Sequence, residues 1–226
     1  MPVILNGKSL RAGALNGKTL KHIYNGDKLI WSSKVAYSDD FNRSSLGSNW
    51  SAFLNPIPVI SSQRVLSQDT ARSALYVRPF ATTEQEVSAL VGRASEVNST
   101  TVLSSGLFIR AKDTSNYVIV TCGTYSSTAG EATWRRSIQI RSVIGGTDTT
   151  RVTATNTLNA ISAVMKVTAQ DNVYSVFIED VLAAQWTDTA RVYPTADPSY
   201  NKAGIWTFES SAFNRSFVDN FAMRDL

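Results

Sequence analysis

Short runs of alternating or continuously apolar residues, rich in Val, Ile, Thr, Phe and Trp, follow one another along most of this chain. They are separated by turn-forming groups such as Asp-Thr-Ser, Gly-Gly and Gln-Asp-Asn. No window of helical length carries a 3.6-residue period. Strands that recur about every ten residues, with turn residues between them, are typical of two packed antiparallel sheets. The sequence therefore predicts an all-β fold, an antiparallel β-sandwich of the jelly-roll kind.

The composition is that of a globular chain with a sizeable core. Of its 226 residues, 43% are apolar and only 18% are charged, which leaves a surface made largely of Ser, Thr, Asn and Gln. The net charge of +4 comes from 22 Lys and Arg against 18 Asp and Glu, scattered along the chain. Because no run of basic residues defines a stripe that could follow a phosphate backbone, we expect no nucleic-acid partner.

Several kinds of chemistry lack the residues that they need. Cys122 is the only cysteine, so no intrachain disulfide forms, and His22 is the only histidine. A zinc site or a Ser-His-Asp hydrolase is therefore not expected, and neither is a cofactor. No segment reaches the roughly 18 uninterrupted apolar residues of a membrane span. Residues 1–20 lack the apolar region of a signal peptide, so we expect synthesis in a cytoplasm and no membrane insertion.

The N-terminal segment carries the dipeptide Asn-Gly three times, at residues 6–7, 16–17 and 25–26. Asn-Gly between alternating residues favours a tight hairpin turn, because both central positions of that turn need a positive φ. The spacing of Leu10 and Leu15 puts these two side chains on opposite faces of one strand unless Gly13 forms a β-bulge. The three turns predict a small four-stranded meander, with strands at residues 2–5, 8–15, 18–24 and 27–31.

One face of this meander is expected to be apolar. Its members are Leu15, Leu20, Tyr24, Leu29 and Trp31. A sheet of some thirty residues has no second layer to cover such a face and is marginally stable alone. We therefore interpret residues 1–34 as an attachment module that docks on the body of the same chain, on a symmetry mate or on a different protein. A small decorative sheet on the main domain, residues 38–226, is the alternative interpretation.

Segments of the main domain resemble one superfamily in their order along the chain. DDFNRSSLGSNW (39–50) is similar to the opening of the concanavalin-like lectin and glucanase jelly rolls, which include laminin-G-like domains. SGLFIRAKDTSNYVIV resembles their central hairpin, VYSVFIEDVLAAQW a later hairpin, and AGIWTFES with SFVDNFAMRDL the closing strands. The resemblance covers residues 38–226. It implies that the first and last strands pair near Phe41 and Phe221 and close the sandwich.

The Asn-Gly segment resembles the N-terminal modules of minor tail and baseplate proteins from tailed phages, where such a module precedes an adhesin-like domain. This resemblance implies a protein located in the virion. The expected partners are other virion proteins, contacted through the N-terminal module, and a host cell-surface polysaccharide. A homo-oligomer, in particular a homotrimer, is expected from the resemblance alone.

Catalysis by the glucanase route is not expected. Retaining glucanases of the superfamily place acidic residues on one strand in an E-x-D-x-x-E arrangement, since hydrolysis needs two carboxyl groups about 5–5.5 Å apart. This chain has no such run. Glu84 with Glu86 opens a strand, and Glu179 with Asp180 falls in a hairpin turn, so neither pair meets the requirement. We therefore predict a protein that is not an enzyme.

A metal site is not predicted either. Asp39, Asp40 and Asp219 are expected to come together where the first and last strands meet, and Asp113 lies in a turn of its own. Carboxylates with backbone carbonyls suit Ca²⁺. Caps and turn hydrogen bonds are the favoured explanation of these aspartates, because Asp side chains commonly make both.

Two polar stretches are the candidate ligand sites. Binding a sugar needs an exposed aromatic platform beside groups that bond hydroxyls, and loops carry such sites more often than strands do. The stretches are residues 121–137 and 186–202. The candidate ligand-binding residues in them are Tyr125, Trp134, Arg136, Trp186 and Tyr193. Each Trp has a core role as its alternative.

The sequence thus leaves more than one function open. The first hypothesis is a non-enzymatic virion protein of a bacteriophage, in the minor tail, baseplate or fibre, whose sandwich contacts host surface glycan. The second is a structural decoration protein of capsid or tail with no glycan ligand. A glycan-active enzyme or a free lectin is the third.

Overall fold

The computed structural model describes most of the chain, with defined gaps. In residues 1–33 and 209–214 it describes the strands and their pairing, but not the side chains. In the body, the residues outside the description are 68–69, 95–101, 127–133, 158–159, 192–196 and 212–213. In the N-terminal segment, they are 1–2, 6–7, 11–13, 16–17, 20–21, 26–27 and 33.

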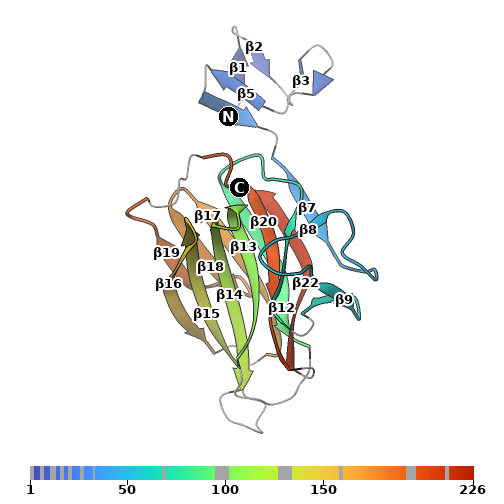
Figure 1. Ribbon diagram of the computed structural model, residues 1–226. Coiled ribbons are helices and arrows are strands. Elements are labelled where there is room, and N and C mark those ends of the chain that lie inside the picture. The colour runs from blue at the N-terminus through green and yellow to red at the C-terminus, as the bar shows by residue number, and fades with distance from the viewer. Residues whose placement is uncertain are drawn as a thin grey trace.

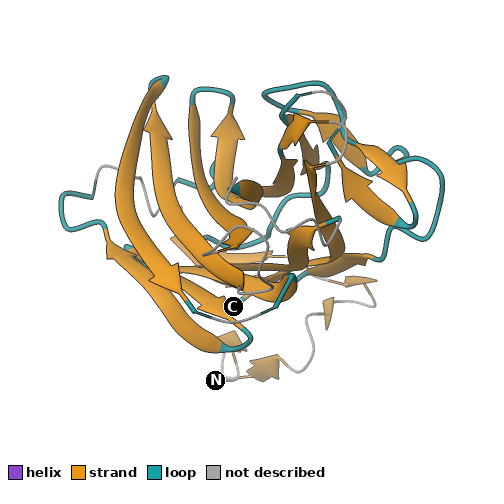
Figure 2. Ribbon diagram, turned by 90° about the horizontal axis from the view of Figure 1, so that it is seen from below, coloured by secondary structure: helices purple, strands orange, loops and turns teal. Residues whose placement is uncertain are grey.

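Two antiparallel sheets, joined by loops, form the body of the protein (Figures 1 and 2). The nine-stranded sheet has the order β19 (Val181–Thr187), β18 (Val173–Ile178), β17 (Ser162–Gln170), β12 (Gln85–Arg93), β22 (Asn214–Asp225), β10 (Arg64–Leu66), β9 (Val59–Ser61); β7 (Ala36–Asp39) and β21 (Glu209–Ser211) also pair with β22. The seven-stranded sheet has the order β16 (Thr147–Asn156), β15 (Trp134–Ile144), β14 (Asn116–Ser126), β13 (Leu103–Asp113), β20 (Lys202–Thr207), β11 (Arg72–Tyr76), β8 (Trp50–Ala52). The described chain holds no helix, so none that could cross a membrane. The predicted all-β jelly-roll sandwich is confirmed.

The core fills the space between the two sheets. Alternate residues of each strand point inward, so Val118 and Val120 of β14 meet Val87 of β12 and Val167 of β17 in one continuous apolar cluster. All four of these side chains are fully buried. Burial of a side chain of this kind contributes roughly 1.5–3 kcal/mol, which makes inter-sheet packing the main stabilising interaction of the body.

The first and last strands of the body pair, as the resemblance implies. β7 lies antiparallel to β22, with Asp39 opposite Phe221. Trp50 packs edge-on against the Phe221 ring, with 4.9 Å between the ring centroids, and lies 5.6 Å from the Phe41 ring. This aromatic group holds the beginning and the end of the domain together.

The N-terminal segment forms three separate hairpins. β1 (Val3–Leu5) pairs with β2 (Lys8–Leu10), β3 (Ala14–Leu15) with β4 (Lys18–Thr19), and β5 (His22–Asn25) with β6 (Lys28–Ser32). The first two pairs flank an Asn-Gly dipeptide, whereas the third flanks Gly26-Asp27, one residue later than expected. Figure 1 shows these strands beyond the end of the sandwich at which β7 begins.

The described strands therefore differ from the single four-stranded meander that the alternation predicts. Leu10 and Leu15 belong to different strands, so their spacing needs no bulge, and Gly13 lies outside the described residues. In the third hairpin Tyr24 lies opposite Leu29, and Trp31 lies opposite Ile23 after a shift in register. The predicted apolar attachment face stays a prediction: Leu20 is not described, and the side chains of Leu15, Tyr24, Leu29 and Trp31 are not described either.

Candidate functional site

The outer face of the seven-stranded sheet carries an ordered row of side chains. Trp206 of β20 lies opposite Gly106 of β13, which lies opposite Thr121 of β14. Thr121 lies opposite Gln139 of β15, and Gln139 opposite Thr153 of β16. Their chain neighbours face the core, so these five residues point away from it. One row across five strands thus holds an indole, a bare glycine, two hydroxyls and an amide.

Two aromatic rings stand together at one end of this row. The rings of Trp206 and Phe208 are nearly parallel, with an angle of 11° and a centroid separation of 6.1 Å. Both side chains are partly exposed. The Phe208 amide donates to the Ser216 hydroxyl at 2.9 Å, and the Ser216 amide donates back to the Phe208 carbonyl at 3.1 Å. This reciprocal contact fixes the backbone that carries the second ring.

Gly106 leaves the sheet surface low beside the indole. A methyl group at this position would lie 3.1 Å from the Val120 carbonyl oxygen and 3.4 Å from Thr121 Cγ2. Ile119 Cδ1 would also lie 3.4 Å from that methyl group, and Gly106 and Thr121 are buried, so the strands pack closely beside the indole. An apolar ring face near exposed hydroxyl and amide groups is an arrangement that suits a sugar ring, which has one apolar face and a rim of hydroxyls.

Polar side chains continue along the neighbouring strands. The next row holds Ser104 of β13 and Ser137 of β15, on either side of Gly123 of β14, and Tyr125 lies opposite Arg135 beyond it. Gln139 is partly exposed, and its amide makes no hydrogen bond within the described part of the chain. These hydroxyl and amide groups are available to bond sugar hydroxyls.

The other end of the same face is closed. The segment after β8 folds over it, and the Phe53 ring packs edge-on against Phe108 and Tyr117 at 5.0 and 5.4 Å. Ser73 Oγ accepts hydrogen bonds from the Leu54 and Asn55 amides at 3.0 and 3.2 Å, which holds the segment down. Ser73 lies opposite Trp206, and Phe53 and Trp206 pack against the same apolar cluster, so Trp206 stands at the edge of the covered area and the open part of the face extends from it toward β16.

Tyr117, at the closed end of the face, is uncharged at ordinary pH. Burial raises the pKa of the Tyr117 phenol, and the nearby Asp148 carboxylate raises it further. Asp148 itself forms an ion pair with Arg141. Tyr117 is therefore neutral at ordinary pH and acts as a packing residue.

The predicted ligand-binding residues fall in different places. Tyr125 lies on the outer face described above and is partly exposed. Trp186 is partly exposed but stacks on Tyr174 at 4.9 Å, with Arg151 5.2 Å from its ring centroid. Tyr193 lies outside the described residues. The structure does not bring these three residues into one site.

Trp134 and Arg136 point into the sandwich. Trp134 is 8% exposed, with the Arg93 guanidinium 5.3 Å from its ring centroid, and Arg136 is fully buried. Arg136 donates to Thr124 Oγ1 at 3.0 Å and to the Ala160 carbonyl at 2.8 Å. Their burial does not favour ligand contact. We interpreted residues 121–137 as a single polar loop, but β14 extends to Ser126 and β15 begins at Trp134, so strand parity turns both side chains inward.

Sequence reasoning missed Trp206 and Phe208. Both lie in the run AGIWTFES, which the sequence correctly identifies as a strand region. Ile205 is fully buried and Trp206 is not, so the alternation of that strand puts Trp206 and Phe208 on the outer face. This alternation is visible in the sequence, but the resemblance to the closing strands says nothing about which face Trp206 occupies.

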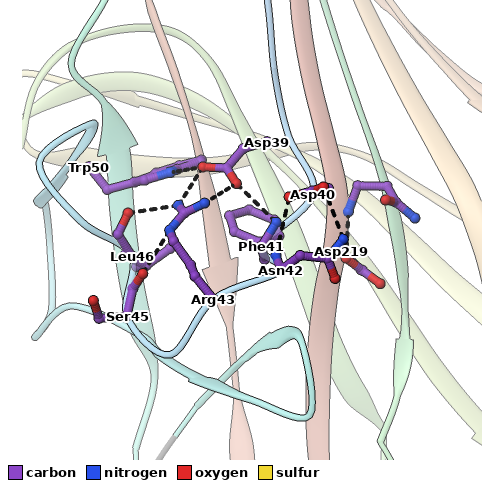
Figure 3. A network of polar contacts seen from close by, with 10 residues as sticks. Asp39, Asp40, Phe41, Asn42, Arg43, Ser45, Leu46, Trp50 and Asp219 are labelled. Atoms are coloured by element: carbon purple, nitrogen blue, oxygen red, sulfur yellow. Dashed lines mark hydrogen bonds and ion pairs between the residues drawn. The ribbon is translucent and has the colours of Figure 1, made fainter.

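The aspartates near the first strand form a structural network (Figure 3). Asp39 Oδ1 accepts from the Phe41 amide at 2.9 Å and from Arg43 at 2.6 Å, and Oδ2 accepts from Arg43 at 2.6 Å and from Trp50 Nε1 at 2.7 Å. Burial acts to raise the pKa of Asp39, but the hydrogen bonds from Arg43, Trp50 and Phe41 together hold it below its usual value.

The three carboxylates expected to gather have separate partners. Asp40 accepts from the backbone amide and the side chain of Asn42, and Asp219 accepts from the Asn220 amide. Among the described residues, no group of three His, Cys, Asp or Glu side chains could hold a metal ion. A polar hollow next to the network is lined by Ser38, Asp40, Asn49 and Asn220, among others.

The other acidic candidates make contacts on or beside the nine-stranded sheet. Glu86 forms an ion pair with Arg224, and Asp180 with Lys166. Glu84 and Glu179 accept hydrogen bonds from the backbone amides of Asp171 and Val164. These acidic residues thus have structural contacts away from the outer face that carries Trp206.

Comparison with solved structures shows the fold. No protein-family model matches the chain, and no curated protein sequence matches it. The carbohydrate-binding module CBM66 from Bacillus subtilis is similar at 10% identity and a TM-score of 0.53, over 78% of this chain and 96% of that one. The CBM2 module of the evolved Dit protein of Lactobacillus casei BL23 phage J-1 is similar at 9% identity and 0.55, over 84% and 96%.

A β-glucanase from Bacillus licheniformis is also similar, at 11% identity and a TM-score of 0.50, over 84% of this chain and 97% of that chain. The neighbours thus include both binding modules and hydrolases. At such low identity they establish the architecture alone. The chain has an antiparallel jelly-roll sandwich, the architecture that the resemblance of its segments implies.

Proposed function

We propose that this protein is a carbohydrate-binding module without catalytic activity, and that its ligand lies on the open part of the outer face of the seven-stranded sheet. The observation that carries the proposal is the pair of nearly parallel rings of Trp206 and Phe208 beside bare Gly106, in a row with Thr121 and Gln139. Stacking on aromatic rings combined with convergent polar groups is how small-ligand sites gain both affinity and orientation.

The scarcity of carboxylates among the described side chains of this face favours binding over hydrolysis. Retaining hydrolysis needs two carboxyl groups about 5–5.5 Å apart. Among the described side chains of the outer face, Asp148 is the single carboxylate, and it is engaged by Arg141. The described part of the face thus offers neither an acid nor a nucleophile pair.

We further propose that the protein belongs to a bacteriophage virion, as a minor tail, baseplate or fibre-associated protein that contacts host surface glycan. Two observations support this. The Asn-Gly sequence pattern of residues 1–34 resembles the modules that precede adhesin-like domains in tailed phages, and one similar structure is a module of a phage Dit protein. The N-terminal hairpins would dock on other virion proteins, and the sandwich would face the host.

Binding to host cell-wall polysaccharide fractions tests the glycan proposal. We expect the wild-type chain to bind at least one fraction, and Trp206→Ala and Phe208→Ala each to weaken that binding at least tenfold, because an aromatic contact contributes on the order of 1–2 kcal/mol and the rings act together. Phe177→Ala is the matched control, since Phe177 is also partly exposed but lies on the nine-stranded sheet.

Two results would count against the proposal. Equal losses in Phe177→Ala and Trp206→Ala would indicate a general effect on folding. Failure of the wild-type chain to bind any fraction would favour a structural decoration protein of capsid or tail with no glycan ligand.

A further inference from the structure

The charges on the outer face of the seven-stranded sheet are not balanced. Its described side chains include three cations, Arg135, Arg141 and Lys202, and one carboxylate, Asp148. The ion pair between Arg141 and Asp148 neutralises one cation. Arg135 and Lys202 form no hydrogen bond or ion pair within the described part of the chain, so two positive charges on this face remain uncompensated there.

The three arginines of β15 have different surroundings. Arg136 is fully buried and donates to Thr124 and to a backbone carbonyl, and Arg141 is held by Asp148. Both therefore have structural roles. Arg135 is exposed and lies opposite Tyr125, whose ring is partly exposed on the same face. Among the residues that the structure describes, none engages the planar guanidinium of Arg135, which can donate two parallel hydrogen bonds to an anion.

Arg135 is close enough to the aromatic rings for one polysaccharide chain to contact both. It is four residues from Gln139 along β15, and β15 is three strands from β20, so the backbone positions of Arg135 and Trp206 are about 20 Å apart. Between them lie Gly106, Thr121 and the two serines of the neighbouring row. The surface from Trp206 to Arg135 thus carries hydroxyl groups, together with the exposed side chain of Val102, which lies over Gly123 between the two serines.

We propose that the ligand is an anionic polysaccharide, with sugar rings stacked on Trp206 and Phe208 and a carboxylate or phosphate of the same chain bound by Arg135. This proposal rests on the proposed glycan-binding function and specifies its ligand class. Carboxylate and phosphate share the chemistry that a guanidinium recognises: two oxygens that accept parallel N–H hydrogen bonds.

The test uses the full chain and four probes. These are polygalacturonate, the same polymer after chemical reduction of its carboxyl groups, a poly(glycerol phosphate) teichoic acid and a neutral β-glucan. Affinity is measured for the wild type, Arg135→Gln, Arg135→Lys, Trp206→Ala and Lys34→Gln. Lys34→Gln is the matched control, because it removes the same charge from an exposed residue next to β7, away from the outer face.

We expect tighter binding to one of the two anionic polymers than to the neutral ones, and the polymer preferred identifies carboxylate or phosphate as the anion. Arg135→Gln should weaken anionic binding about two- to fivefold, the range of an exposed charge contact, and leave neutral binding unchanged. Arg135→Lys should restore part of the loss, and Lys34→Gln should have no effect. Raising the salt concentration should lower the affinity of the wild type for the anionic polymer more than it lowers the affinity of Arg135→Gln.

The outcomes separate this inference from the proposed function. Equal affinity for charged and neutral polymers, with loss in Trp206→Ala, would overturn the anionic ligand and keep the glycan site. Equal losses in Arg135→Gln and Lys34→Gln would also overturn it, because they would indicate attraction by net charge alone. Absence of binding to all four probes and to the host fractions would overturn both.

Discussion

Asp39 illustrates how one residue positions a whole segment. Its two carboxylate oxygens accept four hydrogen bonds, from Arg43, Trp50 and the Phe41 amide, and Phe41 itself has a positive φ of 53°. A carboxylate so fully engaged is a structural residue. The aspartate-rich opening of the domain is therefore explained by the anchoring of residues 39–50 against the last strand.

Replacing this carboxylate should destabilise the fold. We expect Asp39→Asn to lower the free energy of unfolding at pH 7 by about 1.5–3 kcal/mol, the range for hydrogen bonds to a charged group. Asp40→Asn, at an exposed position, should change it far less. Urea unfolding of the two variants measures the difference, and similar small losses in both would contradict the structural role.

The contribution of Asp39 should also depend on pH. Its folded-state pKa lies below the ordinary value of 3.8, so the ionised form stabilises the folded state above that pH. The contribution is lost as the pH falls below 3.8 and through the folded pKa. Unfolding of wild type and Asp39→Asn at pH 7, 5 and 3 should therefore give a constant difference at the upper two values and a smaller one at pH 3.

At the level of elements, alternation decides which face of a strand is functional. β15 shows this most clearly: Trp134, Arg136 and Ile138 face the core, and Arg135, Ser137 and Gln139 face outward. The same parity makes Trp206 a surface residue next to buried Ile205. A search for a sugar site in this fold therefore has to follow parity along strands as well as polar loops.

The segment that closes one end of the outer face offers a separate test. Phe53→Ala should lower the free energy of unfolding by about 2 kcal/mol, because it removes edge-on contacts with Phe108 and Tyr117 at a partly exposed position. Glycan affinity at the Trp206 end should stay within about twofold if the two halves of the face are independent. A large loss of affinity would show that the closed end belongs to the binding site.

The sequence predicts the class of fold well and the site only in part. β-Branched runs and turn residues are local signals, so the strands around Ile119 and Val176 were expected correctly, and the pairing near Phe221 was expected from the resemblance of the segments to the superfamily. The burial of Arg136 was not expected, and a core role for Trp134 was expected only as an alternative, because the pairing of Ser126 with Trp134 that sets the ends of β14 and β15 leaves no local signal in the sequence. The row from Trp206 to Thr153 joins residues far apart in sequence, and only the register of five strands brings them together.

At the level of the whole molecule, the chain combines three N-terminal hairpins with one large sandwich. If the hairpins serve attachment and the sandwich serves binding, a chain that starts at Lys34 should bind polysaccharide as tightly as the full chain. Lys34 is kept because Val35 donates to Asp225 at 2.7 Å and also accepts from its amide at 3.0 Å, which ties the start of the body to its end. Loss of binding in the shortened chain, with its unfolding unchanged, would show that the hairpins form part of the site.

The outer face of the seven-stranded sheet is the proposed glycan-binding surface of this protein. The most direct measurement is a crystal structure of the protein with an oligosaccharide prepared from the polysaccharide that it binds best. We expect sugar rings over Trp206 and Phe208, with hydroxyls bonded to Gln139 or Ser137, which are partly exposed. Sugar bound instead in the hollow beside Asp40 and Asn220, or against the nine-stranded sheet, would contradict it.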